Sequence, residues 1–173
     1  MESSANMRMT MENKSQAVKA AELIAEITAK RTPESPNELK NFLSCVEVKK
    51  NAVIVDGNWS LFEGTFLEMI PEIFKTCAAL TSQKFEAHAY YETTCAWNAT
   101  IDADRNANSL NMKTVVSVNG DGTCPECGET MVCFDEYDPN ETYYCPECGD
   151  EIGHEEMFGG KPPVITKETI IIG

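Results

Sequence analysis

The chain has 173 residues, of which 42% are hydrophobic and 24% charged, a composition typical of a globular protein that excludes a fully disordered one. Its 14 Lys and Arg side chains against 28 Asp and Glu give a formal net charge of -14, which disfavours direct binding to nucleic acid. No apolar run is long enough to span a membrane, and the polar N-terminus lacks the apolar segment of a secretory signal. We therefore expect a cytoplasmic protein with no membrane partner.

The acidic charge is concentrated in the C-terminal third. Residues 121–173 contain 13 acidic side chains and only two basic ones, Lys161 and Lys167. This asymmetry indicates either a separate module with an interaction surface or a solvated acidic face that keeps the protein soluble. The candidate recognition residues are Glu129, Asp135, Glu136, Asp138, Glu141, Asp150, Glu151, Glu155 and Glu156.

The N-terminal third predicts two helices and a hairpin. Residues 1–14 show no hydrophobic period, and we expect them to be disordered. Between Ala17 and Ile27, apolar residues recur every three or four positions, which indicates a helix. Pro36 and a capping box begin a second helix that ends near Ser44. The β-branched run over 46–55 then predicts a hairpin with its turn near residues 49–51.

The central part predicts a core helix and a sheet. A capping box at Ser60 precedes an amphipathic helix that reaches Cys77, and Pro71 should kink this helix or divide it. Residues 85–97 and 110–118 alternate apolar and polar side chains, as in a long antiparallel hairpin packed on this helix. The predicted fold class is α+β, with N-terminal helices and an antiparallel sheet packed on a central helix.

The polar segment between these two strands imitates the start of a calcium-binding EF-hand loop, with Asp or Asn at positions 102, 104, 106 and 108. The required glycine is replaced by Ala107 and the final glutamate by Lys113. We therefore interpret the segment as the polar tip of the hairpin.

The strongest chemical signal is a repeated cysteine pair. Cys124-Pro125-Glu126-Cys127-Gly128 recurs at residues 145–149 as the same five residues, with 17 residues between Cys127 and Cys145. Cys-x₂-Cys pairs at such a spacing are typical of zinc sites, because a two-residue turn brings both sulfurs to one ion at about 2.3 Å. A glycine after each pair can adopt the positive φ that the turn requires.

Over residues 123–153 this pattern resembles the zinc-ribbon family, with a β-hairpin between the two pairs. The resemblance implies four ligands to one structural Zn²⁺ ion: Cys124, Cys127, Cys145 and Cys148. A rubredoxin-type iron site is the main competitor, whereas a disulfide framework conflicts with the low cysteine content and the missing export signal. Four thiolates would close the coordination shell, which disfavours catalysis at this metal. The predicted domains are residues 15–119 for the α+β part, 120–156 for the ribbon, and 157–173 for a linker and tail.

The other cysteines and the histidines have ordinary structural interpretations. Cys45, Cys77, Cys95 and Cys133 lie in apolar stretches and are expected to be small buried side chains. His88 is expected at the surface or in a hydrogen bond. His154 could replace a cysteine as ligand, but the presence of four cysteines disfavours this. The chain has no phosphate-binding loop, nucleophile elbow or His-Glu-x-x-His helix, so we expect a protein that is not an enzyme.

Two functions fit these features. The first is a non-catalytic acidic protein that binds the basic surface of a nucleic-acid-handling partner in place of the phosphate backbone, by analogy with small phage-encoded inhibitors. The alternative is a zinc-ribbon accessory subunit of a nucleic-acid-processing assembly. The β-prone tail at 164–172 is expected to pair within the chain, or else to add a strand to a partner or a second copy.

Overall fold

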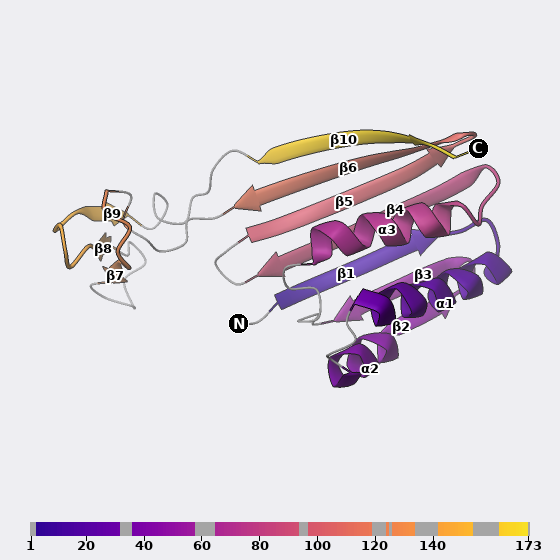
Figure 1. Cartoon of the computed structure of the whole chain (residues 1–173), viewed down its shortest axis with the longest axis horizontal. Helices are drawn as coiled ribbons and strands as arrows, with labels where there is room; N and C mark the ends of the chain where they lie inside the picture. Colours follow the sequence, from indigo (N-terminus) through magenta and orange to yellow (C-terminus); the bar gives the residue numbers. More distant parts are fainter. Residues whose placement is uncertain are drawn as a thin grey trace.

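The computed structural model describes most of the chain, and Figure 1 shows it as a ribbon. The described residues are 3–31, 36–57, 65–93, 97–118, 124, 126–133, 142–153 and 163–172. They form three helices, a seven-stranded sheet and a separate three-stranded sheet. The α+β class is confirmed. None of the described helices combines the length and the apolarity that a membrane crossing needs.

Every neighbouring pair of strands in the large sheet is antiparallel, and the order is β10-β6-β5-β4-β1-β3-β2. The strands are β1 (Ser3–Thr10), β2 (Val46–Lys49), β3 (Ala52–Gly57), β4 (Lys84–Thr93), β5 (Trp97–Asn106), β6 (Ser109–Val118) and β10 (Val164–Ile171). The helices are α1 (Lys14–Arg31), α2 (Pro36–Ser44) and α3 (Phe66–Ala78). All three lie on one face of the sheet, so no described helix covers the opposite face (Figure 1).

One hydrophobic core lies between the helices and the sheet. Helix α3 buries its apolar side against β4, β5 and β6, and Phe66 and Phe74 are completely buried. The Phe66 ring stacks on Tyr91 with a centroid distance of 5.2 Å, and Phe74 meets Phe85 edge-on at 6.3 Å. Aromatic pairs at these separations add to the stabilisation from apolar burial. We refer to the large sheet with its three helices as the body.

Several predicted elements are confirmed. Helix α1 contains the stripe from Ala17 to Ile27, and α2 ends at Ser44 as expected. Strands β2 and β3 form the predicted hairpin, in which Lys50 adopts a left-handed φ of 54°. Helix α3 is a single element with Pro71 inside it, so Pro71 does not divide the helix. The capping box predicted at Ser60 lies outside the described residues.

The expected disorder of residues 1–14 is wrong for the described part of that segment. Residues 3–10 form β1 near the middle of the sheet, between β4 and β3. Ala5, Met7 and Met9 point into the core and are buried, while Asn6 and Arg8 are exposed. The period of two was therefore present in the sequence. It was concealed because its apolar positions hold Ala and Met instead of β-branched residues.

The predicted direct pairing of residues 85–97 with 110–118 is also wrong. Strand β5 lies between β4 and β6, and its residues 102–106 include most of the segment interpreted as a hairpin tip. Asp102 and Asp104 are exposed on the helix-free face, and the actual turn after β5 is Ala107-Asn108, where Ala107 has a φ of 48°. The inward positions of β5 include Ala99, Ala103 and Arg105, so its apolar pattern is weak.

The C-terminal strand β10 pairs with β6, which confirms the expected pairing within the chain. The segment between these two neighbouring strands is therefore an insertion into the sheet. It contains the small sheet of β7 (Val132–Cys133), β8 (Thr142–Tyr144) and β9 (Glu151–Gly153), in the order β7-β8-β9. We refer to the described residues from 124 to 153 as the cysteine module. Figure 1 shows this module beyond the end of the sheet at which β6 ends and β10 begins.

Candidate metal centre

The four cysteines of the repeated pairs converge on one point. Their Sγ atoms all lie within 4.8 Å of one another. The Sγ atom of Cys124 is 3.5 Å from that of Cys148, and the Sγ atom of Cys127 is 3.4 Å from that of Cys145. Sulfurs placed tetrahedrally at about 2.3 Å from an ion would be about 3.8 Å apart. The cluster therefore has the dimensions of a four-thiolate metal site, and these four cysteines form no disulfide.

Each cysteine pair is shaped by the same turn. The N–H of Gly128 donates to the carbonyl oxygen of Cys124 at 2.8 Å. The N–H of Cys124 in turn donates to the carbonyl oxygen of Glu129 at 2.7 Å. The second pair repeats both bonds, from Gly149 to Cys145 at 2.9 Å and from Cys145 to Asp150 at 2.8 Å. Gly128 and Gly149 have φ values of 79° and 76°, a region that favours glycine. The sequence repeat is thus a repeat in backbone geometry.

Backbone amides stabilise negative charge on the sulfurs. The N–H of Cys148 donates to the sulfur of Cys145 and is the largest cause that holds the pKa of this thiol at about 7, below its usual value. Amides of Glu129 and Asp150 also donate to the sulfurs of Cys127 and Cys148, but hydrogen bonds with the neighbouring thiols outweigh them and raise the pKa of both groups. A metal ligand must be the thiolate, so these donors prepare the site for a cation.

The cysteine module has almost no hydrophobic core. Its buried side chains are Cys124, Cys145, Met131 and Ile152, with Tyr143 packed against them. Cys127 and Cys148 are exposed. Two apolar side chains beside the cysteines cannot supply the burial that holds a fold of this size together. A metal ion held by the four sulfurs would supply the missing stabilisation.

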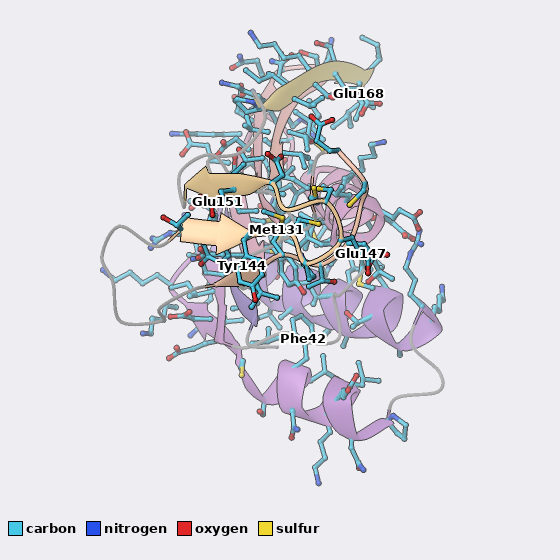
Figure 2. The ribbon with its side chains drawn as sticks, turned by 90° about the vertical axis from the view of Figure 1, so that its left-hand side faces the viewer. Phe42, Met131, Tyr144, Glu147, Glu151 and Glu168 are labelled. Atoms are coloured by element: carbon cyan, nitrogen blue, oxygen red, sulfur yellow. The ribbon has the colours of Figure 1, made fainter. Side chains whose placement is uncertain are left out.

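The surface of the module is acidic. Glu126, Glu129, Glu147 and Glu151 are exposed and Asp150 is half-buried, and the sequence from 114 to 160 contains no Lys or Arg. Figure 2 shows the module end-on, with Glu147 and Glu151 on either side of it. Glu126 and Glu147 are inside the cysteine turns and were missing from the predicted recognition residues. Asp135, Glu136, Asp138, Glu141, Glu155 and Glu156 lie outside the described residues, as does His154.

The remaining candidates have structural roles. Cys77 is buried, as predicted, and this burial raises the pKa of its thiol to about 12. Cys45 is half-buried, Cys95 lies outside the described residues, and Cys133 belongs to β7. His88 makes a surface hydrogen bond, as expected, with its Nδ1 atom 2.6 Å from Oδ1 of Asp102.

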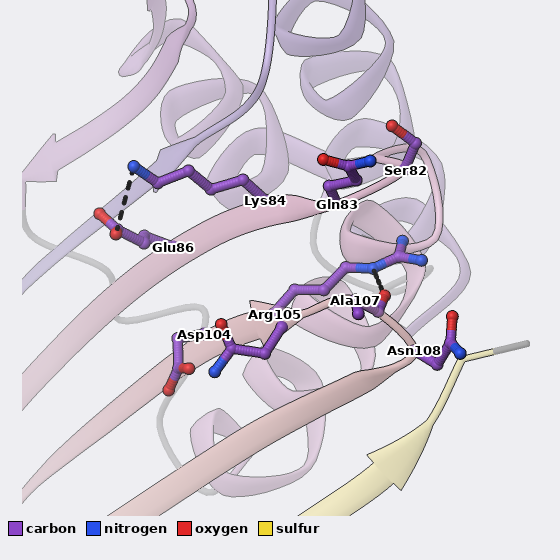
Figure 3. Close-up of a pocket in the computed structure, with 9 residues that line it drawn as sticks. Ser82, Gln83, Lys84, Glu86, Asp104, Arg105, Ala107 and Asn108 are labelled. Carbon is purple, nitrogen blue, oxygen red and sulfur yellow. Dashed lines mark hydrogen bonds and ion pairs between the residues drawn. The ribbon is translucent and has the colours of Figure 1, made fainter.

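A cavity of about 500 Å³ lies beside the turn between β5 and β6 (Figure 3). Two of its polar lining residues have partners: Lys84 lies 3.9 Å from Glu86, and the hydroxyl of Ser82 donates to Glu12. Arg105, which sequence analysis missed, donates to the carbonyl oxygens of Ala78 and Thr81 and so caps the C-terminal end of α3. These contacts stabilise the turns that line the cavity.

No protein-family model, curated protein or solved structure matches this chain. The likeness to zinc ribbons therefore remains a resemblance carried by the two cysteine turns. What the structure itself adds is the convergence of four free thiols into a cluster that could hold a metal ion.

Proposed function

We propose that this chain is a zinc-stabilised, non-catalytic interaction protein whose cysteine module binds a basic surface of a nucleic-acid-handling protein. The observation that supports this proposal best is the combination found in the module. Four thiols converge there, and every charged side chain described around them is acidic.

Zinc fits the cysteine cluster because Zn²⁺ favours four thiolates in tetrahedral geometry. The spacing of the sulfurs and the amide donors to them both suit this ion. Four thiolates leave no open coordination position, so the ion would hold the module together without taking part in catalysis. Iron is the competing metal, and elemental analysis of the purified protein distinguishes the two.

Zinc would also strengthen the acidic field of the module. One Zn²⁺ ion with four thiolates has a net charge of about -2. This charge adds to that of the exposed glutamates, and no cation of the module offsets it. A field of one sign speeds the encounter with a surface of the opposite sign. Surfaces that bind nucleic acid are basic, so the module could occupy such a surface in place of phosphate, as a phage-encoded inhibitor of a nuclease would.

A second candidate is an accessory subunit that docks into a nucleic-acid-processing assembly. The observation that favours it is the position of the cysteine module in the chain, as an insertion between the neighbouring strands β6 and β10. Tethering at both ends would let the module project as a docking element while the body is held elsewhere. Both proposals place the protein in a reducing compartment such as the cytoplasm, where free thiols persist.

The test compares two charge-reversed variants of equal net charge. The first changes Glu126, Glu129, Glu147 and Glu151 to Lys, and the control changes the exposed Glu22, Glu26, Glu38 and Asp56 of the body to Lys. The partner is obtained by pull-down from the native host, and association rates are measured against salt. The module variant should associate about tenfold more slowly than the wild type or worse, because complementary charge acts on the encounter rate. The control should stay close to the wild type, and equal rates for both variants would contradict the phosphate-mimic proposal.

A further inference from the structure

Strand β10 is an exposed edge of the large sheet (Figure 1). It follows β6 in the strand order, and no other described strand pairs with its outer side. Among the described residues, the three most exposed large hydrophobic side chains all lie on it: Val164 at 63%, Ile165 at 54% and Ile171 at 76%. A long edge strand with exposed apolar side chains is a template for pairing with another strand.

The opposite edge of the sheet is protected, which makes β10 unusual within this molecule. Strand β2 has only four residues, and Lys49 on it lies 3.4 Å from Glu47 in an ion pair. Helix α2 packs beside this strand. Short length, charge and a covering helix are the usual ways in which proteins prevent pairing at an edge. Strand β10 is less protected: it has eight residues, no described helix packs along it as α2 packs along β2, and its only charged side chains are Lys167 and Glu168 near its centre.

The free main-chain groups of β10 can be assigned from its pairing with β6. The N–H of Ile172 donates to the carbonyl oxygen of Asn108 at 2.7 Å, directly after the pair formed by Ile171 and Ser109. Hydrogen-bonded and non-hydrogen-bonded pairs alternate along an antiparallel ladder. The even-numbered residues of β10 therefore bond to β6. The odd-numbered ones direct their N–H and C=O groups outward, namely Ile165, Lys167, Thr169 and Ile171.

We propose that the occupant of this edge is a second copy of the chain, whose own β10 pairs antiparallel with it about a two-fold axis at Glu168. In this register Ile165 lies opposite Ile171 of the second copy, and Lys167 lies opposite Thr169. It is the one register in which every outward N–H and C=O of these four residues finds a partner. The two sheets become one continuous sheet, and the closed two-fold arrangement stops further growth at these edges.

The side chains also match in this register. Ile165 and Ile171 pair with each other on the helix-free face, where each is more than half exposed in one chain. On the helix face, Val164 lies opposite Ile172 of the second copy, and Thr166 lies opposite Ile170. All of these residues are β-branched and all but Thr166 are apolar, and directly opposed side chains of this kind stabilise neighbouring strands.

Charge determines the choice among the possible registers. The two Glu168 side chains meet at the axis, but Nζ of Lys75 lies 3.7 Å from Oε1 of Glu168 in each copy, so two ammonium groups balance two carboxylates. An axis at Lys167 would instead place two lysines together. Lys113 lies directly opposite Lys167 on β6 in each copy, which would gather four cations. Like charges directly opposed destabilise a strand pair.

The topology keeps the acidic modules apart in such a dimer. The insertion leaves β6 at Val118 and returns at Val164, so both tethers are at the same end of the sheet. Antiparallel pairing places the tethers of the two copies at opposite ends of the joined sheet. The contact is a strand edge and smaller than a standard interface, so we expect a weak, reversible dimer of micromolar order.

The first experiment measures sedimentation velocity of the full chain over a range of concentrations. The wild type should show a reversible monomer–dimer equilibrium. Lys167→Pro should weaken the dimer about tenfold or more, because it removes an outward N–H while the bonds of β10 to β6 remain. Leu67→Lys, which changes a 42% exposed apolar side chain on α3, is the control and should dimerise like the wild type. A wild type that stays monomeric at every concentration, or a Lys167→Pro variant that dimerises normally, would overturn the proposal.

The second experiment tests the register by oxidative cross-linking. Residues at the axis form a non-hydrogen-bonded pair with Cα atoms about 4.5 Å apart, within the range that a disulfide spans. The Glu168→Cys variant should therefore form a covalent dimer. Thr166→Cys should not, because residue 166 lies opposite Ile170 of the second copy and not opposite its own counterpart. Cross-linking at position 166 in place of 168 would refute this register.

Discussion

The body and the cysteine module are held together by different physical means. The body buries one continuous set of apolar side chains from three helices and five of its seven strands. The module buries two apolar side chains and two of its cysteines, with one tyrosine packed beside them. The body can therefore fold by removing apolar surface from water, whereas the module lacks enough of this surface. In the module, a metal ion held by the four cysteines would take the place of a hydrophobic core.

The largest expected effect comes from breaking the module at its metal site. Structural zinc contributes about 10–16 kcal/mol of apparent binding free energy in small zinc domains. Cys145→Ser, or chelation of the metal, should therefore unfold the module while the body stays folded. The measurement is a two-dimensional amide NMR spectrum. Signals of residues 126–133 and 142–153 should collapse, and those of β1 and β4 should remain.

Cys45→Ser is the matched control for this experiment. Cys45 is half-buried and donates its thiol to the carbonyl oxygen of Asn41 at 3.4 Å, a bond that a serine hydroxyl can also make. Unfolding of the insertion would destabilise the pairing of β6 with β10 only slightly. Closing a loop costs about 0.6 kcal/mol more free energy for each doubling of its length. Loss of the signals of the body in Cys145→Ser would contradict the independence of the two regions.

The converse experiment breaks the body and leaves the module intact. Phe74 is completely buried in α3 and meets Phe85 edge-on. Phe74→Ala should lower the free energy of unfolding of the body by about 3–5 kcal/mol, because it creates a cavity. Urea unfolding followed by circular dichroism gives this value. Metal content, measured by elemental analysis, should stay at one equivalent, and a parallel loss of metal would show that the two regions fold together.

The sequence predicted the elements whose signals are local. Pro36 with its capping box marked α2, and the two five-residue cysteine repeats marked the four-cysteine cluster and its turns. Strands β1 and β5 were not predicted, because their inward positions hold Met, Ala and Arg, which are not typical strand residues. The alternation in β1 could have been found by counting it at period two.

Two stabilising residues could not be predicted, because their partners are distant in the sequence. Arg105 lies on a strand, and its function becomes visible only when the C-terminal end of α3 is placed beside it. Glu12 follows β1, and its partners Gln83 and Lys84 lie at the start of β4. Side chains of this kind complete a turn that another segment has left with unpaired backbone groups. Neither position shows a local pattern that distinguishes it from an ordinary surface charge.

Glu12 closes the turn between α3 and β4. Its Oε1 atom accepts the backbone N–H groups of Ser82, Gln83 and Lys84 at 3.1, 2.6 and 2.9 Å. The amide of Gln16 donates to its other oxygen at 3.2 Å. These bonds, with that from Lys84 the largest cause, lower the pKa of Glu12 from 4.5 to about 2. The contact therefore belongs to the body and sets part of its acid stability.

The smallest expected effect is a change in this acid dependence. A carboxyl group whose pKa is lowered on folding contributes stability that is fully present above its unfolded pKa of 4.5 and is lost as the pH falls towards 2. Glu12→Gln should therefore destabilise the body at neutral pH, and its stability should approach that of the wild type in acid. Urea unfolding of the body between about pH 2 and pH 7 measures the difference, with the metal removed so that thiol protonation does not contribute. Glu22→Gln, an exposed change on α1, should show no such convergence. A constant difference between Glu12→Gln and the wild type across this range would mean that the carboxylate acts by its shape alone and not by its charge.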